Sequence, residues 1–371
     1  MAMYKRSIIY TGPFNPRLCD GISSSTIDLL VFLKSRGHEV FIISFMHDSN
    51  DIRQTLNTGI YPFKTEILSR GDNFCNFIMD GINIYSAFLP LSRDEILSCH
   101  PIVLEQYLRK IREYSNSYFF TVDIDCTCLV AHSILSTSSA HFIHSPVSSI
   151  DLFNHDAALK TILRKQTVFT VSEFSQNEIL KTLNIQSRVW PPFINPAKYK
   201  YPKRNNSGRK LGYYSAGSHK GDEIVESLVE EMPDYHFVIM GYGYPPVWNA
   251  PNVTFLGPTT DLDLFYGEIS ALLVPSMMPE GYPRVIIEAA LNGIPAIANR
   301  IGGIPEAMGH CGILIEMESH EKMVEKYKLA IQNLHDNQKK YEEYSNKAIE
   351  RAEKYKMEIE QLSSDYESKF F

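Results

Sequence analysis

Two glutamates eight positions apart frame residues 280–288, which read EGYPRVIIE. The Gly-Tyr-Pro turn and the apolar run after it predict a helix over residues 284–291, which the following Asn-Gly pair ends. The unpaired N–H groups at the start of such a helix, from about Arg284 to Ile286, attract anions such as phosphate. This stretch therefore predicts a phosphate-binding corner with a carboxylate on either side.

The position of each glutamate suggests a role. Glu288 would lie about 7.5 Å along the helix axis at roughly 1.5 Å per residue, close to the span between the phosphate and the ribose of a nucleotide. Glu280 would lie beyond the phosphates, where an attached sugar would sit. Such spacing is common, and both side chains could equally be surface residues. The preceding strand-like run ending at residues 274–276 favours a site, because parallel sheets bind ligands at the carboxyl ends of their strands.

Strand-like and helix-like segments alternate along the chain, which predicts two doubly wound α/β domains. In the N-terminal half, strands are expected at residues 6–10, 39–45, 117–122, 140–144 and 167–171, with a helix at 24–35. In the C-terminal half, strands are expected at 211–215, 236–240, 253–256, 271–274, 294–298 and 312–315, with helices at 222–231 and 284–291.

Two further segments differ from the rest of the chain in composition. Residues 190–210 are proline-broken and basic, which predicts a solvated linker between the domains. The same basic residues could also touch an anionic membrane surface. The last fifty residues are charged and contain an apolar stripe at helical spacing, so they predict a packed helical tail. That stripe consists of Met323, Tyr327, Ala330 and Leu334.

The overall composition excludes several classes of protein. The chain has 371 residues, of which 44% are hydrophobic, so two domains with sizeable cores are expected. A net charge of −7 argues against nucleic acid as a partner. No apolar run is long enough for a membrane span, and the N-terminus does not resemble a signal peptide. The six cysteines lack metal-binding spacing, so free thiols in a reducing cytoplasm are expected, and Cys126 and Cys128 read as two small helix residues.

Residues 275–308, PSMMPEGYPRVIIEAALNGIPAIANRIGGIPEAM, resemble the donor-binding signature of glycosyltransferase family 4, which comprises retaining enzymes of GT-B fold. That signature has two glutamates separated by seven residues, then a strand and a Gly-Gly-x-x-Glu turn, here Gly302, Gly303 and Glu306. Weaker similarity extends over nearly the whole chain, at FIHSP, TVSEFS, GSHKG and VIMGYG.

The resemblance implies an architecture. The chain would be an α/β protein of GT-B fold, with two Rossmann-like doubly wound domains facing a central cleft. Residues 1–192 would form the N-terminal acceptor domain and residues 193–350 the C-terminal nucleotide-sugar donor domain. Residues 351–371 would form a C-terminal helix that packs back on the N-terminal domain.

The resemblance also implies site residues in the donor domain. Glu280 would contact the hydroxyls of the donor sugar, and Glu288 the ribose. The backbone between them would contact sugar and phosphate, which implies donor-binding roles for Gly281, Tyr282, Pro283, Arg284 and Val285. The family usually carries Phe-Gly where this chain has Tyr282-Pro283, and the proline removes one N–H donor.

Other implied residues lie in glycine-containing loops and at a strand end. Lys220 matches a diphosphate-binding lysine, whereas Ser218 occupies the position of the family's arginine, a charge that Arg284 could supply instead. Gly12, with Gly21 at the other end of its loop, would approach the diphosphate and the acceptor. His144 matches a histidine near the reacting sugar, although a lone strand-end histidine is more often structural.

Two motifs are not given functional roles. Asp123 and Asp125 have Asp-x-Asp spacing, but they follow a predicted strand and begin a helix, so a metal role is rejected. Gly241 and Gly243 form a GxG pair without the third glycine of a dinucleotide site.

The resemblance implies a metal-independent, retaining glycosyltransferase that moves a hexosyl or related sugar from a nucleotide diphosphate sugar, UDP- or GDP-linked, to a hydroxyl. No cofactor is implied. The acceptor would be a glycan or glycolipid in surface polysaccharide biosynthesis, and the location cytoplasmic or peripheral on the inner membrane face. The alternatives are a GT-B sugar-nucleotide epimerase or a catalytically inactive sugar-nucleotide-binding subunit. A phosphorylase is disfavoured because it would need a pyridoxal-binding lysine in a longer chain.

Overall fold

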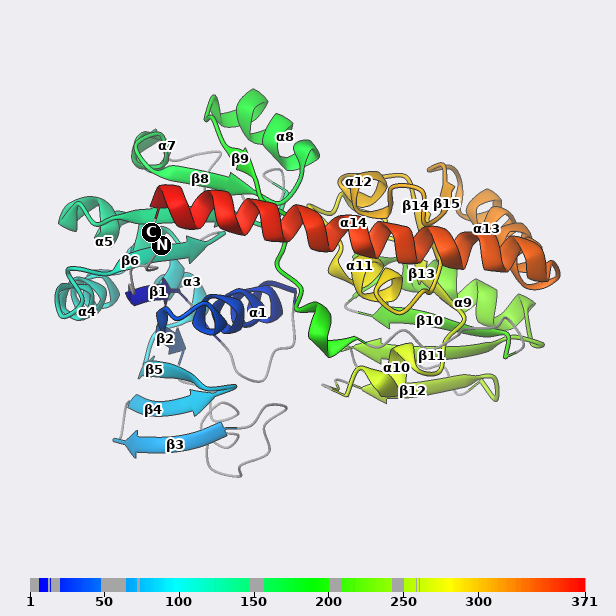
Figure 1. The fold of residues 1–371 in the computed structure, drawn as a ribbon, viewed down its shortest axis with the longest axis horizontal. Coiled ribbons are helices and arrows are strands. Elements are labelled where there is room, and N and C mark those ends of the chain that lie inside the picture. Colours follow the sequence, from blue (N-terminus) through cyan, green and yellow to red (C-terminus); the bar gives the residue numbers. More distant parts are fainter. Residues whose placement is uncertain are drawn as a thin grey trace. The chain divides into compact units, whose positions relative to one another are not determined.

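The computed structural model describes residues 7–12, 14, 21–47, 65–71, 74–123, 125–146, 157–199, 208–215, 217–241, 250–257, 259 and 261–370. The chain divides into two compact units, each built on one sheet (Figure 1). The first unit comprises residues 1–193 and 362–371, and the second comprises residues 194–361. The predicted boundaries at residues 192 and 350 stay predictions.

The first unit contains a nine-stranded sheet of order β3-β4-β5-β2-β1-β6-β7-β8-β9. Its strands are β1 Ser7–Thr11, β2 Glu39–His47, β3 Thr65–Arg70, β4 Phe74–Met79, β5 Ile82–Leu89, β6 Tyr118–Val122, β7 Ser139–Ile143, β8 Thr167–Thr170 and β9 Arg188–Val189. Its helices are α1 Gly21–Ser35, α3 Arg93–Leu97, α4 Pro101–Arg112, α5 Cys126–Leu135, α7 Ala157–Leu163 and α8 Glu173–Leu183. The strands from β5 to β9 in this order pair in parallel, as predicted.

One edge of this sheet departs from the prediction. Strand β4 pairs antiparallel with both β3 and β5, in a meander that the sequence reading missed. Its second turn uses Asp80 and Gly81, both with positive φ, which is the conformation that a tight hairpin needs. Strand β4 alternates between buried and more exposed side chains, as expected of an edge region with one solvated face.

The second unit contains a six-stranded parallel sheet of order β12-β11-β10-β13-β14-β15. Its strands are β10 Lys210–Ser215, β11 His236–Gly241, β12 Val253–Gly257, β13 Ala271–Val274, β14 Ala296–Asn299 and β15 Gly312–Ile315. Its α-helices are α9 Asp222–Glu231, α10 Asp263–Tyr266, α11 Arg284–Ala290, α12 Ile304–Met308 and α13 His320–His335, together with most of α14 Gln338–Phe370. Each of the six strands lies where the sequence predicted one, within two residues.

The core of the second unit explains the helical tail. The predicted stripe of α13 is confirmed, because Met323, Tyr327, Ala330 and Leu334 are all buried in the cluster that covers the sheet. The sheet contributes Leu211, Tyr213, Phe237, Ile239, Ala271, Leu273, Ile297 and Ile315. The charged residues of α13 occupy its other face, which is the pattern expected of an amphipathic helix.

The predicted solvated linker is wrong for its first residues. Trp190, Phe193 and Ile194 are at most 5% exposed, and the short 3-10 helix η2 at Pro196–Lys198 follows them. The prolines do stop α-helices and strands from forming here. The apolar side chains of this segment are nevertheless buried, because removing apolar surface from water is favourable. Residues 200–207, which carry part of the basic stretch, lie outside the described residues, as does Gly243. In the part of the chain that the structure describes, no helix is long and apolar enough to cross a membrane.

Candidate functional site

The loops of interest in the second unit follow two neighbouring central strands. From β10 the chain continues to β11 on one side of the sheet, whereas from β13 it continues to β14 on the other side. The sheet therefore has its topological switch point between β10 and β13, where parallel α/β sheets bind ligands. Residues 217–221 follow β10, and residues 275–283 follow β13, so both predicted donor-binding loops begin at this point.

Lys220 and Glu280, one from each loop, are in direct contact. The Lys220 Nζ donates to Glu280 Oε2 at 2.5 Å, and the Ser276 hydroxyl donates to the other carboxylate oxygen. The backbone N–H of Met277 also donates to the His219 carbonyl at 2.9 Å, which ties the two loops together. The Lys220 and Glu280 side chains are 24% and 16% exposed, so the ion pair is accessible to a ligand yet partly shielded from water.

Glu288 is held by residues that the sequence reading did not connect to it. Tyr266 donates its hydroxyl to Glu288 Oε2 at 2.8 Å, and Arg284 Nε donates to Oε1 at 3.2 Å. Burial and the neighbouring Glu288 charge raise the pKa of Tyr266 well above its usual value, so this hydroxyl remains a donor. Arg284 is itself 8% exposed and pairs with Glu288, which sets its guanidinium against the carboxylate. Nothing in the sequence pattern linked Tyr266, in α10, to this helix.

The start of α11 differs in detail from the predicted anion site. Pro283 is the N-cap residue, one position earlier than the first helical residue. The Ile286 N–H donates to the Pro283 carbonyl at 3.3 Å, so it is used within the turn. The Ile286 N–H is therefore not available to the predicted anion site.

A second turn packs against the backbone of this loop. The Gly303 N–H donates to the Glu280 carbonyl at 2.7 Å. A Cβ on Gly302 would lie 2.6 Å from the Glu280 backbone N and O atoms, and a Cβ on Gly303 would lie 1.9 Å from the Gly281 carbonyl oxygen. Both positions therefore need glycine, and the Gly-Gly part of the predicted signature has a structural explanation. Glu306 follows in α12 and is partly buried.

Substitution Gly303→Ala should destabilise the protein, because the new Cβ meets backbone that cannot move aside as a side chain could. Overpacking typically costs about 1–3 kcal/mol, and a backbone clash belongs at the upper end of this range. Urea unfolding should show the lowered midpoint. Gly208→Ala is the matched control, since its Cβ would lie 3.7 Å from the nearest atom. Equal midpoints for the two variants would contradict the close approach described above.

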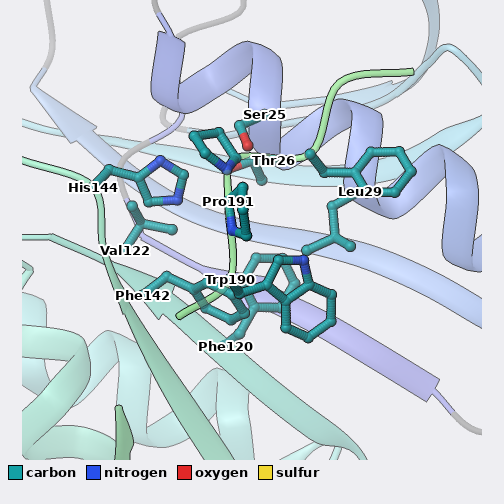
Figure 2. Close-up of a pocket in the computed structure, with 11 residues that line it drawn as sticks. Ser25, Thr26, Leu29, Phe120, Val122, Phe142, His144, Trp190 and Pro191 are labelled. Carbon is teal, nitrogen blue, oxygen red and sulfur yellow. The ribbon is translucent and has the colours of Figure 1, made fainter. Parts of the chain in front are cut away.

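His144 lines a pocket in the first unit, at the carboxyl end of β7. Figure 2 shows its ring beside Val122 and Pro191, with Ser25 and Thr26 of α1 above. Aromatic rings lie below, from Phe120, Phe142 and Trp190. The pocket is therefore mainly apolar, with two hydroxyls and one imidazole on its lining.

Asp123 and Asp125 both accept hydrogen bonds from nearby backbone N–H groups. Asp123 Oδ1 accepts from the backbone N–H groups of His144 and Ser145 at 2.6 and 3.0 Å, which fixes the turn that carries His144. Asp125 Oδ1 caps α5 by accepting from the Cys128 N–H at 2.9 Å, and burial raises the pKa of Asp125 to about 6. Among the described residues, no group of three or more His, Cys, Asp or Glu side chains could hold a metal ion.

Gly12 lies at the end of β1, the strand next to β6 in the first sheet. Its N–H donates to the Ile43 carbonyl at 3.2 Å, and its φ of 154° is unfavourable for other residues. A Cβ there would lie 2.6 Å from the Tyr10 hydroxyl oxygen. The glycine is thus required locally. Gly21 is the first residue of α1, and the residues between 14 and 21 lie outside the description.

Sequence comparison shows similarity to glycosyltransferases over part of the chain. Residues 222–333 match the sequence family described as Glycosyl transferases group 1. An uncharacterized glycosyltransferase of Haemophilus influenzae is 30% identical over 173 residues, which are 42% of this chain and 48% of that relative. The chain thus spans about half the length of this curated relative.

Solved structures match over almost the whole chain. Sucrose-phosphate synthase from Thermosynechococcus elongatus has a TM-score of 0.73 at 17% identity, covering 99% of both chains. HepE of Anabaena, solved in complex with UDP and glucose, has a TM-score of 0.70 at 15% identity, covering 98% of this chain and 100% of that one. The predicted fold is confirmed: the protein is an α/β protein of GT-B fold, and its residues 222–333 resemble Glycosyl transferases group 1.

Proposed function

We propose that the protein transfers a sugar from a nucleotide diphosphate sugar to a hydroxyl acceptor. The observation that supports this most directly is the arrangement at the switch point between β10 and β13. There Lys220 contacts Glu280 at 2.5 Å, and Glu288 is held by Tyr266 and Arg284. A cation for the diphosphate, a carboxylate for the sugar and a fixed carboxylate for the ribose are thus supplied by residues that follow two adjacent strands.

The proposed reaction breaks the bond between the anomeric carbon and the diphosphate oxygen. The sugar gains oxocarbenium character, and negative charge develops on the leaving diphosphate. The Lys220 ammonium would stabilise that charge, after exchanging its contact with Glu280 for one with phosphate. The acceptor oxygen bonds to the anomeric carbon, and its proton passes to the departing phosphate. No step needs a metal in this scheme.

Retention of anomeric configuration is part of the proposal. The acceptor would attack on the side that the diphosphate leaves. Both oxygens of Glu280 already accept hydrogen bonds, from Lys220 and Ser276. A carboxylate whose two oxygens already accept hydrogen bonds is better suited to orienting sugar hydroxyls than to forming a covalent bond with the sugar. Glu280 is therefore assigned a sugar-positioning role.

UDP is the proposed nucleotide and a glycan or glycolipid the proposed acceptor. The complex of HepE with UDP and glucose supports UDP over GDP. His144, which is partly exposed at the edge of the first-unit pocket, is proposed to lie near the reacting sugar. Hexosyl transfer, a role in surface polysaccharide biosynthesis and peripheral attachment to the inner membrane face belong to the same proposal.

A thermal-shift screen with UDP, GDP, ADP, dTDP and CMP tests the nucleotide site. UDP at a hundred times its Kd should stabilise the folded state by about 2.7 kcal/mol. For a domain of this size that is roughly 5–10 °C in Tm. The shift should persist in EDTA. Equal Tm values with and without all five nucleotides would contradict the proposal, whereas a GDP-specific shift would correct the donor.

Catalysis is tested separately from binding. With UDP-glucose as donor and a panel of simple glycosides as acceptors, UDP should be released only when an acceptor is present. Release without any acceptor would favour the epimerase or a hydrolase. UDP binding without release under any condition would favour a sugar-nucleotide-binding subunit.

A further inference from the structure

Side chains of helix α14 donate hydrogen bonds to backbone carbonyls in the loops of the second unit. Its buried stripe includes Tyr341, Ala348, Ala352 and Tyr355, all 0% exposed. The Tyr341 hydroxyl donates to the Ser270 carbonyl at 3.0 Å, and Ser345 Oγ donates to the Gly293 carbonyl at 2.7 Å. These bonds fix the register of the helix against the loops that border β13 and α11.

Arg351 on this helix reaches two segments of the proposed donor site. Its Nη2 donates to the Tyr282 hydroxyl at 2.6 Å, and its Nε donates to the Ala307 carbonyl at 2.9 Å. Its Nη1 lies 3.5 Å from Glu358 Oε2 on the same helix. The side chain is only 10% exposed, so these contacts are largely shielded from water. One guanidinium therefore joins the EGYP turn to the end of α12.

The residues around Arg351 leave space for its side chain and supply a hydrogen-bond acceptor. Gly309, with a φ of 54°, leaves room for the Arg351 stem, since a Cβ there would lie 3.3 Å from Arg351 Cδ. The Tyr282 side chain is 6% exposed. Burial raises the pKa of Tyr282, so its phenol stays neutral and accepts the arginine N–H. A lysine could not replace the planar fork, because it offers a single point charge instead of several donors in fixed directions.

We propose that Arg351 is a positioning residue, which holds the loop of residues 279–283 so that Glu280 meets the donor sugar. The proposal rests on the proposed function. Tyr282 is two residues from Glu280. The Ala307 contact holds α12, and Gly303, the N-cap residue of that helix, donates its N–H to the Glu280 carbonyl. The loop is thus held at the Glu280 backbone and again two residues later, at Tyr282. A displacement of about 1 Å in such a group can cost roughly 10²-fold in rate.

Two variants remove the link in different ways. Arg351→Lys keeps the positive charge and most of the volume, and Tyr282→Phe removes only the hydroxyl. Each should lower kcat for sugar transfer about 10- to 100-fold, while UDP affinity stays within about threefold, because the ribose site at Glu288 is untouched. The double variant should be no worse than Arg351→Lys alone, because that substitution already removes the hydrogen bond that Tyr282→Phe removes. Arg300→Ala is the control, since Arg300 forms an exposed ion pair with Glu316.

Hydrogen exchange of the ligand-free protein tests the holding role without any donor. The amides of Glu280, Gly281 and Tyr282, the three residues of this loop that carry an N–H, should exchange at least tenfold faster in Arg351→Lys than in Arg300→Ala, with global stability measured in parallel. Unchanged exchange in this loop, or kinetic losses that add in the double variant, would overturn the proposal. Faster exchange in Arg351→Lys would show that Arg351 holds the loop, even if the wild type binds no nucleotide. In that case the proposed function fails, and with it the role of the loop in sugar transfer.

Discussion

Replacing Glu288 with glutamine should weaken UDP binding about a hundredfold. Two ribose hydroxyls would donate to the carboxylate, and hydrogen bonds to a charged group contribute about 1.5–3 kcal/mol each. Glutamine keeps the volume but loses the charge and one acceptor. Tyr266 and Arg284 already orient the carboxylate, so no rearrangement is needed for it to receive a ligand. Isothermal titration with UDP measures the effect.

The same substitution also affects stability, which must be separated from binding. Arg284 is 8% exposed and would lose its charged partner, and breaking a buried pair typically costs about 3–5 kcal/mol. Tyr266→Phe is therefore a necessary second variant, because it removes one hydrogen bond to Glu288 and leaves the charges paired. It should weaken UDP binding about fivefold. Glu316→Gln, at an exposed ion pair, should bind as the wild type does. Wild-type affinity in a folded Glu288→Gln protein would refute the ribose role.

Replacing Glu280 with glutamine should lower the turnover of sugar transfer about a thousandfold and leave UDP affinity nearly unchanged. The carboxylate orients the sugar and holds Lys220, and removing one preorganised electrostatic group from an active site costs about 10²–10³ in kcat. UDP has no sugar to contact Glu280, so its binding should depend mainly on Glu288 and Lys220. Initial rates at saturating donor, together with UDP titration, measure the two effects.

The balance between these two effects decides the role of Glu280. A loss of UDP affinity as large as the loss of turnover would show that Glu280 acts mainly by holding Lys220 for the phosphate. Unchanged turnover would remove it from the site altogether. Glu306→Gln is a useful comparison, because Glu306 lies in the same signature but in α12, beyond the Gly-Gly turn.

The local elements could be read from the sequence because each depends on near neighbours. The parallel strands of the second unit are short apolar runs, and α13 has its buried stripe at helical spacing. The signature around Glu280 and Glu288 was likewise visible, since it lies within one strand-turn-helix segment. The switch point between β10 and β13 then follows from the order of the strands in the sheet, which brings Lys220 to Glu280 across sixty residues.

The partners of the site residues were decided only by the tertiary structure. Arg284 could have faced a phosphate or turned along its own helix, and in the structure it pairs with Glu288, whose other oxygen accepts from Tyr266. Likewise, Trp190 is buried in the first unit although its proline-rich setting indicated solvent. Periodicity reports which face of an element is apolar, but the partner of a buried polar group depends on how helices distant in sequence are placed. Arg351 and Tyr282, 69 residues apart, meet for that reason.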